Sequence, residues 1–283
     1  PERSGLYYLH AKGESGRFFS FPWIVAPRQP SAPIAVLASN INWNAYNNFG
    51  GRSNYIYPDK LPPTPTVNAR MDLRRYTDEL HTHFDSEEYA PLSFDRPEPI
   101  NFVPENAQVT DPIEGRSASH VAPAEWRLNA WLEREGFAYD YYAETQFHAG
   151  VLDLDAYKVL IISTHPEYWS QDMYYRLKRW VFERGGKLMY LGGNGLNCEV
   201  VFPDERTMVV MNGRVGHGNF KTLQAMGGYE SRFHLRHESE ANLLGVVCSD
   251  PATEPPSLDF GHVPQQPEQR HRRRLDDAHP QLF

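Results

Sequence analysis

The sequence predicts an α/β fold in which a mainly parallel sheet lies between layers of helices. Three observations support this fold class: short continuous apolar runs that suit buried strands, amphipathic helical segments between them, and glycines where those segments end. Strands that alternate with helices along a chain typically form a parallel sheet that is covered on both faces.

The first apolar run, residues 34–39, predicts a strand that is buried on both faces. Residues 17–30 precede it and predict an extended lead-in, because prolines punctuate them. The strand is followed by a long insertion, residues 40–120, which is rich in Pro, Asn, Asp and Tyr and shows little periodicity. Loops of this length inside compact domains usually carry function, so we expect functional residues there.

Regular structure resumes at Pro123, where a predicted helix begins that Gly136 ends. Its apolar face comprises Ala124, Leu128, Trp131 and Leu132. Residues 137–142 can form a strand, and residues 158–163 predict a second strand of the buried type.

A further predicted helix begins at Ser170, which suits the N-cap position, and ends at Gly185-Gly186. Its apolar side comprises Met173, Leu177, Trp180 and Val181. Residues 187–191 predict a third apolar strand. The whole pattern favours a flavodoxin-like or glutamine-amidotransferase-like layer sandwich with a long loop insertion over residues 1–250. From residue 251 to 283 the composition predicts a disordered tail.

Composition excludes several functional classes. With 28 basic and 36 acidic residues the net charge is −8, which argues against binding to nucleic acids or anionic membranes. No apolar run approaches the roughly 20 residues that a membrane span needs. Two cysteines cannot form a disulfide framework, and they favour a cytoplasmic setting. The first residues lack a methionine and a signal region, so we expect the chain to begin inside a longer protein.

Three polar loops are expected to meet at one edge of the sheet. Residues 40–51, 164–169 and 192–195 each follow a predicted strand. Ligands of open parallel sheets bind outside the carboxyl ends of the strands, so these loops predict the functional site.

The loop 164–169 carries the clearest chemical signal. His165 and Glu167 are separated by Pro166, which stiffens the turn, and both side chains can project into one cleft. An imidazole beside a carboxylate suits general acid–base chemistry or a hard metal ion. A helix-capping turn explains the same residues equally well, with Glu167 near the positive helix end and His165 packed.

A covalent nucleophile is disfavoured, because neither serine nor cysteine lies at the tip of this turn. Cys198 lies in an ordinary context and is expected to be a buried small apolar residue. Activated water fits better, and water becomes a competent nucleophile at neutral pH when a metal lowers its pKa.

The available metal ligands point to a hard ion. The His-Glu-x-x-His zinc spacing is absent, and His81 and His83 form a possible ligand pair, although histidines in polar loops are more often solvated. A glutamate with tyrosines forms an oxygen site that suits Fe(III) far better than zinc. Tyr46 is the candidate phenolate of the first loop, and it is equally well explained as a stacking residue.

Several segments together resemble the C-terminal domain of the N,N-dimethylformamidase large subunit over about residues 17–250. The most specific is His165-Pro166-Glu167-Tyr168-Trp169-Ser170, followed by a helix, Gly185-Gly186, an apolar strand and Gly192-Gly193-Asn194. The others are residues 43–51, 93–97, 229–234 and 238–246.

This resemblance implies a mononuclear Fe(III) held by two tyrosines and a glutamate in a glutamine-amidotransferase-like domain. Glu167 and Tyr46 match two of these ligands. Tyr89 is the choice for the second tyrosine by position, with Tyr55, Tyr57 and Tyr76 as alternatives. The resemblance assigns His165 as base or proton shuttle, and Asn194 as a hydrogen-bond partner of the substrate or of the developing oxyanion.

The implied reaction is hydrolysis of a small N-substituted amide such as dimethylformamide. The implied partners are a small subunit and further copies of the chain. The alternative is a noncatalytic α/β domain that binds a small molecule or a sugar without a metal.

Overall fold

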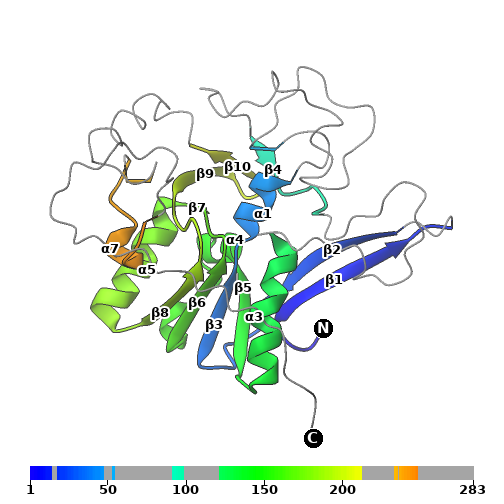
Figure 1. The fold of residues 1–283 in the computed structure, drawn as a ribbon, viewed down its shortest axis with the longest axis horizontal. Helices are drawn as coiled ribbons and strands as arrows, with labels where there is room; N and C mark the ends of the chain where they lie inside the picture. Colours follow the sequence, from blue (N-terminus) through cyan, green and yellow to red (C-terminus); the bar gives the residue numbers. More distant parts are fainter. Residues whose placement is uncertain are drawn as a thin grey trace, which may run out of the picture.

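The structure is a computed structural model that describes residues 1–14, 18–47, 53–54, 91–98, 121–211, 233–234 and 236–247. Its centre is a parallel four-stranded sheet in the order β5-β3-β6-β8 (Figure 1). These strands are β3 (Ile34–Ala38), β5 (Tyr139–Ala143), β6 (Val159–Thr164) and β8 (Lys187–Gly192). This mixed α/β architecture with a mainly parallel central sheet confirms the predicted fold class.

The two central strands are the ones whose burial the sequence predicts. β3 and β6 lie in the middle, and most of their residues are buried, as their continuous apolar sequences predict. β8 lies at the edge, and its side chains alternate between exposed and half-buried. Leu191 is 54% exposed, so the apolar run of β8 does not indicate a central strand.

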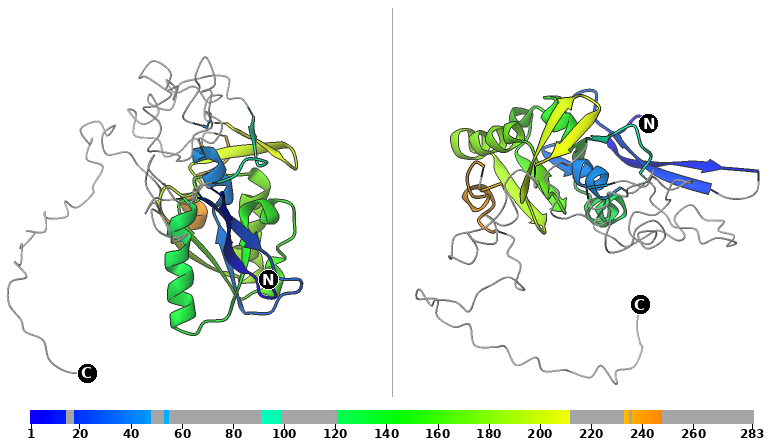
Figure 2. Two further views of the ribbon diagram at one scale, coloured as in Figure 1. Left: turned by 90° about the vertical axis from the view of Figure 1, so that its right-hand side faces the viewer. Right: turned by 90° about the horizontal axis from the view of Figure 1, so that it is seen from above.

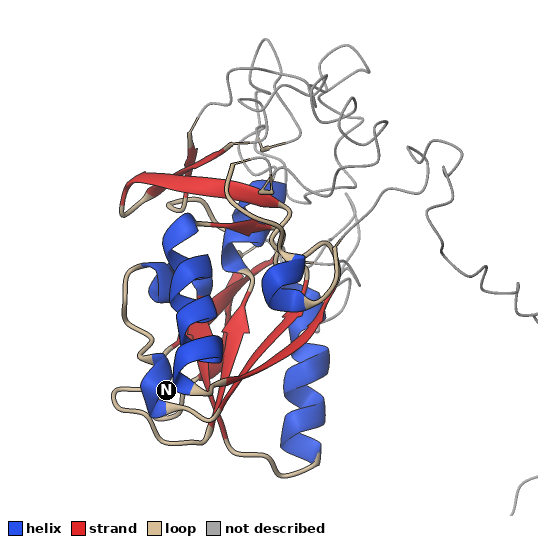
Figure 3. Cartoon of the chain, turned by 90° about the vertical axis from the view of Figure 1, so that its left-hand side faces the viewer, coloured by secondary structure: helices blue, strands red, loops and turns tan. Residues whose placement is uncertain are grey.

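Helices cover both sides of the sheet (Figure 3). α3 (Ala122–Arg134) has Pro123 in its first turn and is followed by Gly136 at φ 74°, close to the predicted ends. Leu132 faces the core, whereas Trp131 is 42% exposed and packs on Phe137. The predicted apolar face of this helix is therefore wrong at Trp131.

α5 (Gln171–Arg184) confirms the second predicted helix and both of its ends. The Ser170 hydroxyl accepts a hydrogen bond from the Met173 backbone N–H at 3.3 Å, and Gly185 takes the left-handed conformation at φ 73°. Three short helical segments are also present: α4 (Glu144–His148), the 3-10 turn η2 (Leu154–Ala156) and α7 (Ala241–Leu244).

Two smaller sheets flank the centre. The predicted extended lead-in is β2 (Phe18–Val25), which pairs antiparallel with β1 (Gly5–Lys12) in a hairpin that projects from the side of the molecule (Figure 2). The other sheet has the order β4-β10-β9-β7 and lies across the carboxyl ends of the central strands (Figure 1). Its strands are β4 (Leu92–Ser93), β7 (Tyr168–Trp169), β9 (Cys198–Asp204) and β10 (Thr207–Val210).

Within the predicted long insertion, the structure describes α1 (Asn40–Tyr46), residues 53–54 and residues 91–98. The predicted tail, residues 251–283, lies outside the described residues. Among the helices that the structure describes, none combines the length and apolar character that a membrane span requires.

Candidate functional site

The loops that follow β3, β6 and β8 meet at the carboxyl edge of the central sheet, as predicted. α1 follows β3 and ends at Tyr46, His165 and Glu167 lie in the turn after β6, and Asn194 lies in the turn after β8. β3 and β6 are neighbours, and the chain leaves β3 toward β5 on one side before it returns to β6 on the other. The site therefore lies at the point where the strand order reverses, which is where open α/β sheets bind ligands.

The turn after β6 directs Glu167 into the protein. Thr164 has φ 68°, a left-handed conformation that a β-branched residue rarely adopts, and it reverses the chain at the end of the strand. The Glu167 backbone N–H then donates to the His165 carbonyl at 2.9 Å, which closes the turn. Ser170, not Glu167, caps α5, so the structure does not support the helix-capping explanation for Glu167.

Two of the predicted residues converge on a carboxylate oxygen of a third. The Tyr46 hydroxyl donates to Glu167 Oε2 at 2.7 Å, and His165 Nε2 lies 3.2 Å from the same oxygen. Glu167 is 5% exposed and Tyr46 is 9% exposed. The Tyr46 ring meets the His165 ring edge to face at 6.0 Å. Tyr46 is thus a hydrogen-bond donor to the carboxylate as well as a ring-packing residue.

Glu167 is held in its ionised form despite its burial. Burial is the largest single effect and raises the pKa of this carboxyl, whereas the hydrogen bond and the charge interaction with His165 lower it. The hydroxyls of Tyr46 and Tyr168 add to this effect, so the pKa of Glu167 lies below its usual value. The site therefore offers a buried anionic oxygen beside a phenol.

Asn194 reaches this cluster because two turns are bonded together through their backbones. The Gly193 N–H donates to the Thr164 carbonyl at 3.1 Å, and the Leu196 N–H donates to the Pro166 carbonyl at 2.8 Å. Asn194 itself has φ 49°, which asparagine tolerates better than most residues. Its Nδ2 lies 3.4 Å from His165 Nε2.

Arg96 holds the carboxyl end of α1. Its guanidinium donates to the backbone carbonyls of Asn44 and Asn47 and to the side-chain oxygen of Asn44, at 2.8–3.1 Å. A cation at a helix C-terminus satisfies carbonyls that have no partner within the helix. Arg96 belongs to one of the motifs that carry the family resemblance, and its contacts explain why that motif accompanies Tyr46.

Tyr168 is a contributor that the sequence reasoning missed. Its hydroxyl supports the Glu167 carboxylate and accepts a hydrogen bond from Asn54 Nδ2 at 3.1 Å. Its ring packs at 6.4 Å from that of Tyr46. Its position next to Glu167 in the sequence was the one indication of a role. The alternation of side chains along a strand of only two residues does not predict which way the Tyr168 side chain points.

Other predicted ligands lie outside the described residues: Tyr89, the alternatives Tyr55, Tyr57 and Tyr76, and the pair His81 and His83. In the part of the chain that the structure does describe, no three His, Cys, Asp or Glu side chains gather as a metal site. Tyr46 and Glu167 supply two adjacent oxygen donors of the kind that hard ions such as Fe(III) prefer, so the residues present fit such an ion.

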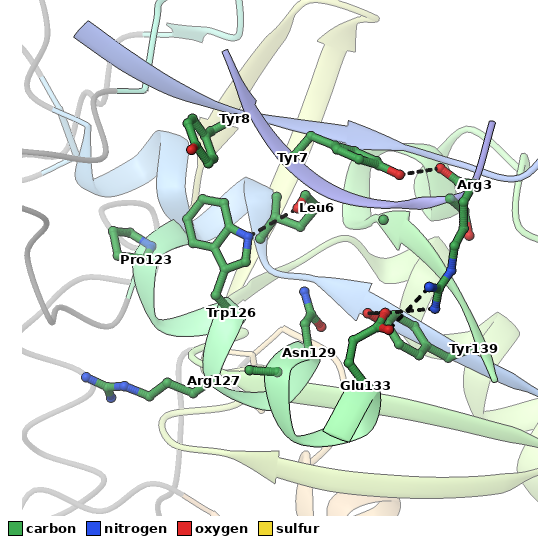
Figure 4. Close-up of a pocket in the computed structure, with 13 residues that line it drawn as sticks. Arg3, Leu6, Tyr7, Tyr8, Pro123, Trp126, Arg127, Asn129, Glu133 and Tyr139 are labelled. Atoms are coloured by element: carbon green, nitrogen blue, oxygen red, sulfur yellow. Dashed lines mark hydrogen bonds and ion pairs between the residues drawn. The ribbon is translucent and has the colours of Figure 1, made fainter. Parts of the chain in front are cut away.

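A large cavity lies away from this cluster. It measures about 760 Å³ and lies between β1 and α3, with Trp126 and Glu133 among its lining residues (Figure 4). None of the predicted site residues lines it. A smaller cavity of about 320 Å³ borders Asn194, between the turn after β8 and Val246-Val247. Cys198 is 1% exposed, in agreement with its predicted role as a buried apolar residue.

Comparison with known proteins supports the resemblance found in the motifs. The family model described as N,N-dimethylformamidase beta subunit-like, C-terminal, matches residues 2–272, which extends the likeness beyond residues 17–250 at both ends. The chain is similar to the N,N-dimethylformamidase beta subunit of Paracoccus aminophilus, with 29% identity over 222 residues. It is also similar to that of an Alcaligenes species, with 28% identity over 227 residues. Each alignment covers 74% of this chain but only 27% of the relative.

Proposed function

Since the chain belongs to the C-terminal family of N,N-dimethylformamidase beta subunits, we propose that it hydrolyses a small N-substituted amide. A dimethylformamide-like substrate would yield formate and an amine. The observation that carries the proposal is the convergence of Tyr46 and His165 on the buried, ionised carboxylate of Glu167. The 2-1-3-4 strand order, counted along the chain, also occurs in flavodoxin-like sheets and supports a glutamine-amidotransferase-like assignment.

We propose that a single ferric ion binds at this carboxylate. Tyr46 and Glu167 would hold it together with a second tyrosine, for which Tyr89 is the candidate. The ion would supply Lewis acidity, which activates both an amide carbonyl and water.

We propose that His165 moves a proton at Nε2. That nitrogen faces Glu167 Oε2 at 3.2 Å and Asn194 Nδ2 at 3.4 Å, and it cannot donate to the first while it accepts from the second. Protonated Nε2 donates toward the carboxylate, and unprotonated Nε2 accepts from the amide. Both protonation states therefore have a partner, which suits a group that takes a proton from water and gives it to the departing amine.

We propose that Asn194 holds the substrate. Its amide N–H groups can donate to the carbonyl oxygen, whose negative charge grows in the transition state. The left-handed backbone at Asn194 and the bonds between the two turns fix this amide before the substrate arrives. Such preorganisation is the basis of oxyanion stabilisation.

The relatives are named as beta subunits, and we propose that this chain also works with a small subunit and as a homo-oligomer. The cytoplasmic setting stays a prediction from the cysteine content.

The proposal is tested by the colour and turnover of protein expressed with supplementary iron. We expect about one iron per chain, a visible phenolate-to-Fe(III) band and release of dimethylamine from dimethylformamide. Tyr46→Phe should lose the band and turnover, and retained iron in Tyr89→Phe would remove Tyr89 from the ligand set. Tyr142→Phe is the matched control, because its hydroxyl also makes a 2.7 Å hydrogen bond, to Tyr157, away from the site.

A colourless, metal-free protein after this expression would contradict the metal proposal and favour the alternative of a binding domain without a metal. Equal iron content in the Tyr46→Phe and Tyr142→Phe proteins would remove Tyr46 from the ligands.

A further inference from the structure

One buried carboxylate joins the two central strands that lead into the site. Glu125 lies in the first turn of α3 and is 1% exposed. Its Oε1 accepts a hydrogen bond from the Ser39 backbone N–H at 3.1 Å, and its Oε2 accepts one from the Ser163 hydroxyl at 3.4 Å. Ser39 follows β3 directly and Ser163 lies in β6, so the side chain bridges neighbouring strands at their carboxyl ends.

The β3 side of this bridge supports the helix that carries Tyr46. α1 has seven residues, and its N-cap, Ser39, makes no side-chain capping bond. So short a helix is not stable by itself, and its first N–H groups need partners from elsewhere. Glu125 accepts from Ser39, and the buried carboxylate of Glu144 accepts from the Ile41 N–H at 3.3 Å.

The β6 side of the bridge supports the turn that carries His165 and Glu167. Ser163 directly precedes Thr164, whose left-handed backbone conformation is strained. The Thr164 hydroxyl lies 3.4 Å from that of Ser163 and also hydrogen-bonds to Glu125. The carboxylate therefore contacts the strained residue that turns Glu167 inward.

We propose that Glu125 is a positioning residue, which sets the spacing of Tyr46 from Glu167 by joining the ends of β3 and β6 beneath them. The expected effect of Glu125 on metal binding rests on the proposed function. Glu125 touches neither Tyr46 nor Glu167 in the hydrogen bonds described, so it acts through Ser39, Ser163 and Thr164.

The protonated carboxyl group of Glu125 and the side-chain amide of glutamine have similar shapes and hydrogen-bonding groups. Burial raises the pKa of the Glu125 carboxyl to about 7, against opposing hydrogen bonds of which that from the Ser39 N–H is the largest. In Glu125→Gln the side-chain oxygen can still accept from Ser39, and its NH₂ can donate to the hydroxyl oxygen of Ser163. Glu125→Leu has a similar volume and can do neither.

The test compares these two variants with Asp140→Asn. Asp140 is also 1% exposed, but it accepts from the backbone and hydroxyl of Ser31, which precedes β3 at the opposite edge of the sheet. Two readouts are needed: the affinity of the metal-free proteins for ferric iron, and amide hydrogen exchange of residues 39–46 and 163–168 without metal.

We expect Glu125→Leu to lower the affinity for ferric iron by about tenfold or more, because loss of residues that orient metal ligands has effects of this size. Its exchange should speed up in both segments, and Glu125→Gln should stay close to wild type. Asp140→Asn should lose stability and exchange faster around Ser31, with unchanged iron affinity. Should Glu125→Leu not fold, Ser163→Ala removes the β6 half of the bridge and should lower the affinity in the same direction.

Unchanged exchange in residues 39–46 and 163–168 of the folded Glu125→Leu protein would overturn the inference, as would an equal loss of iron affinity in Asp140→Asn. Failure of the wild-type protein to bind iron would overturn the proposed metal site instead. The exchange measurement would then still decide whether Glu125 holds the two segments.

Discussion

Gly192→Ala should disturb the site through a single added methyl group. Gly192 ends β8 opposite Thr164, and a Cβ there would lie 2.8 Å from Cδ of Pro166 and 3.2 Å from the Tyr190 ring. Ordinary contacts begin near 3.4 Å, so the proline ring must move by about 0.6 Å, the difference between 3.4 and 2.8 Å. Pro166 stands between His165 and Glu167, and their 3.2 Å contact should change with it.

Overpacking of this kind costs about 1–3 kcal/mol of stability. A displacement approaching 1 Å near reacting groups can cost about a hundredfold in rate, so we expect turnover to fall by roughly ten- to a hundredfold. The assay measures kcat for dimethylformamide, iron content and urea unfolding of the same preparations. Gly193→Ala is the matched control, because a Cβ there has no atom within 4 Å and φ is not left-handed.

Equal turnover in the Gly192→Ala and Gly193→Ala proteins would refute this reasoning. A loss of stability in Gly192→Ala with wild-type kcat and iron content would also refute the link between Pro166 and the two side chains beside it.

The remaining predictions concern stability. The pKa of Glu125 rises from 4.5 to about 7 on folding. Its contribution to the free energy of unfolding is therefore complete below pH 4.5 and is lost as the pH rises through 7. The loss amounts to about 3 kcal/mol, at ~1.4 kcal/mol for each unit of pKa shift. Burial also raises the pKa of Glu144, which therefore makes stability fall with pH in the same direction. To isolate Glu125, urea unfolding of the wild-type and Glu125→Gln proteins is compared from pH 4.5 to 8. Equal pH dependence of stability in the two proteins would contradict the assignment to Glu125. Ser170→Ala removes the N-cap of α5 and should cost about 1 kcal/mol in the same assay. Iron affinity should not change in that variant, and a tenfold loss would show that the cap also supports Glu167.

The central sheet and the meeting of its loops could be predicted because the signals are local. The continuous apolar runs of β3 and β6 indicate strands buried on both faces, and Ser170 and Gly185 mark the ends of α5. Parallel strands then bring their carboxyl ends to one edge whatever the details of packing. The contact of Tyr46 with Glu167 follows from that geometry, although its 2.7 Å hydrogen bond does not.

What could not be predicted depends on tertiary packing. Glu125 has the sequence signature of an ordinary acidic residue in the first turn of a helix, and only the packing of α3 on the sheet buries it between Ser39 and Ser163. The position of β8 at the sheet edge likewise depends on strand order. The role of Tyr168 depends on where its side chain points after the left-handed turn at Thr164, and the periodicity of the sequence does not predict that orientation.

The site also has a consequence for how the protein reaches its native state. Tyr46 and Glu167 are separated by 121 positions along the chain, and their segments are brought together by the pairing of β3 with β6. Contacts between residues so distant in sequence form late and slow the folding of a domain. A nascent or partly folded chain therefore holds only one of the two oxygen donors in place. Under the proposed function, binding of ferric iron would therefore require that β3 and β6 have already paired, because the two ligands are not together before that stage.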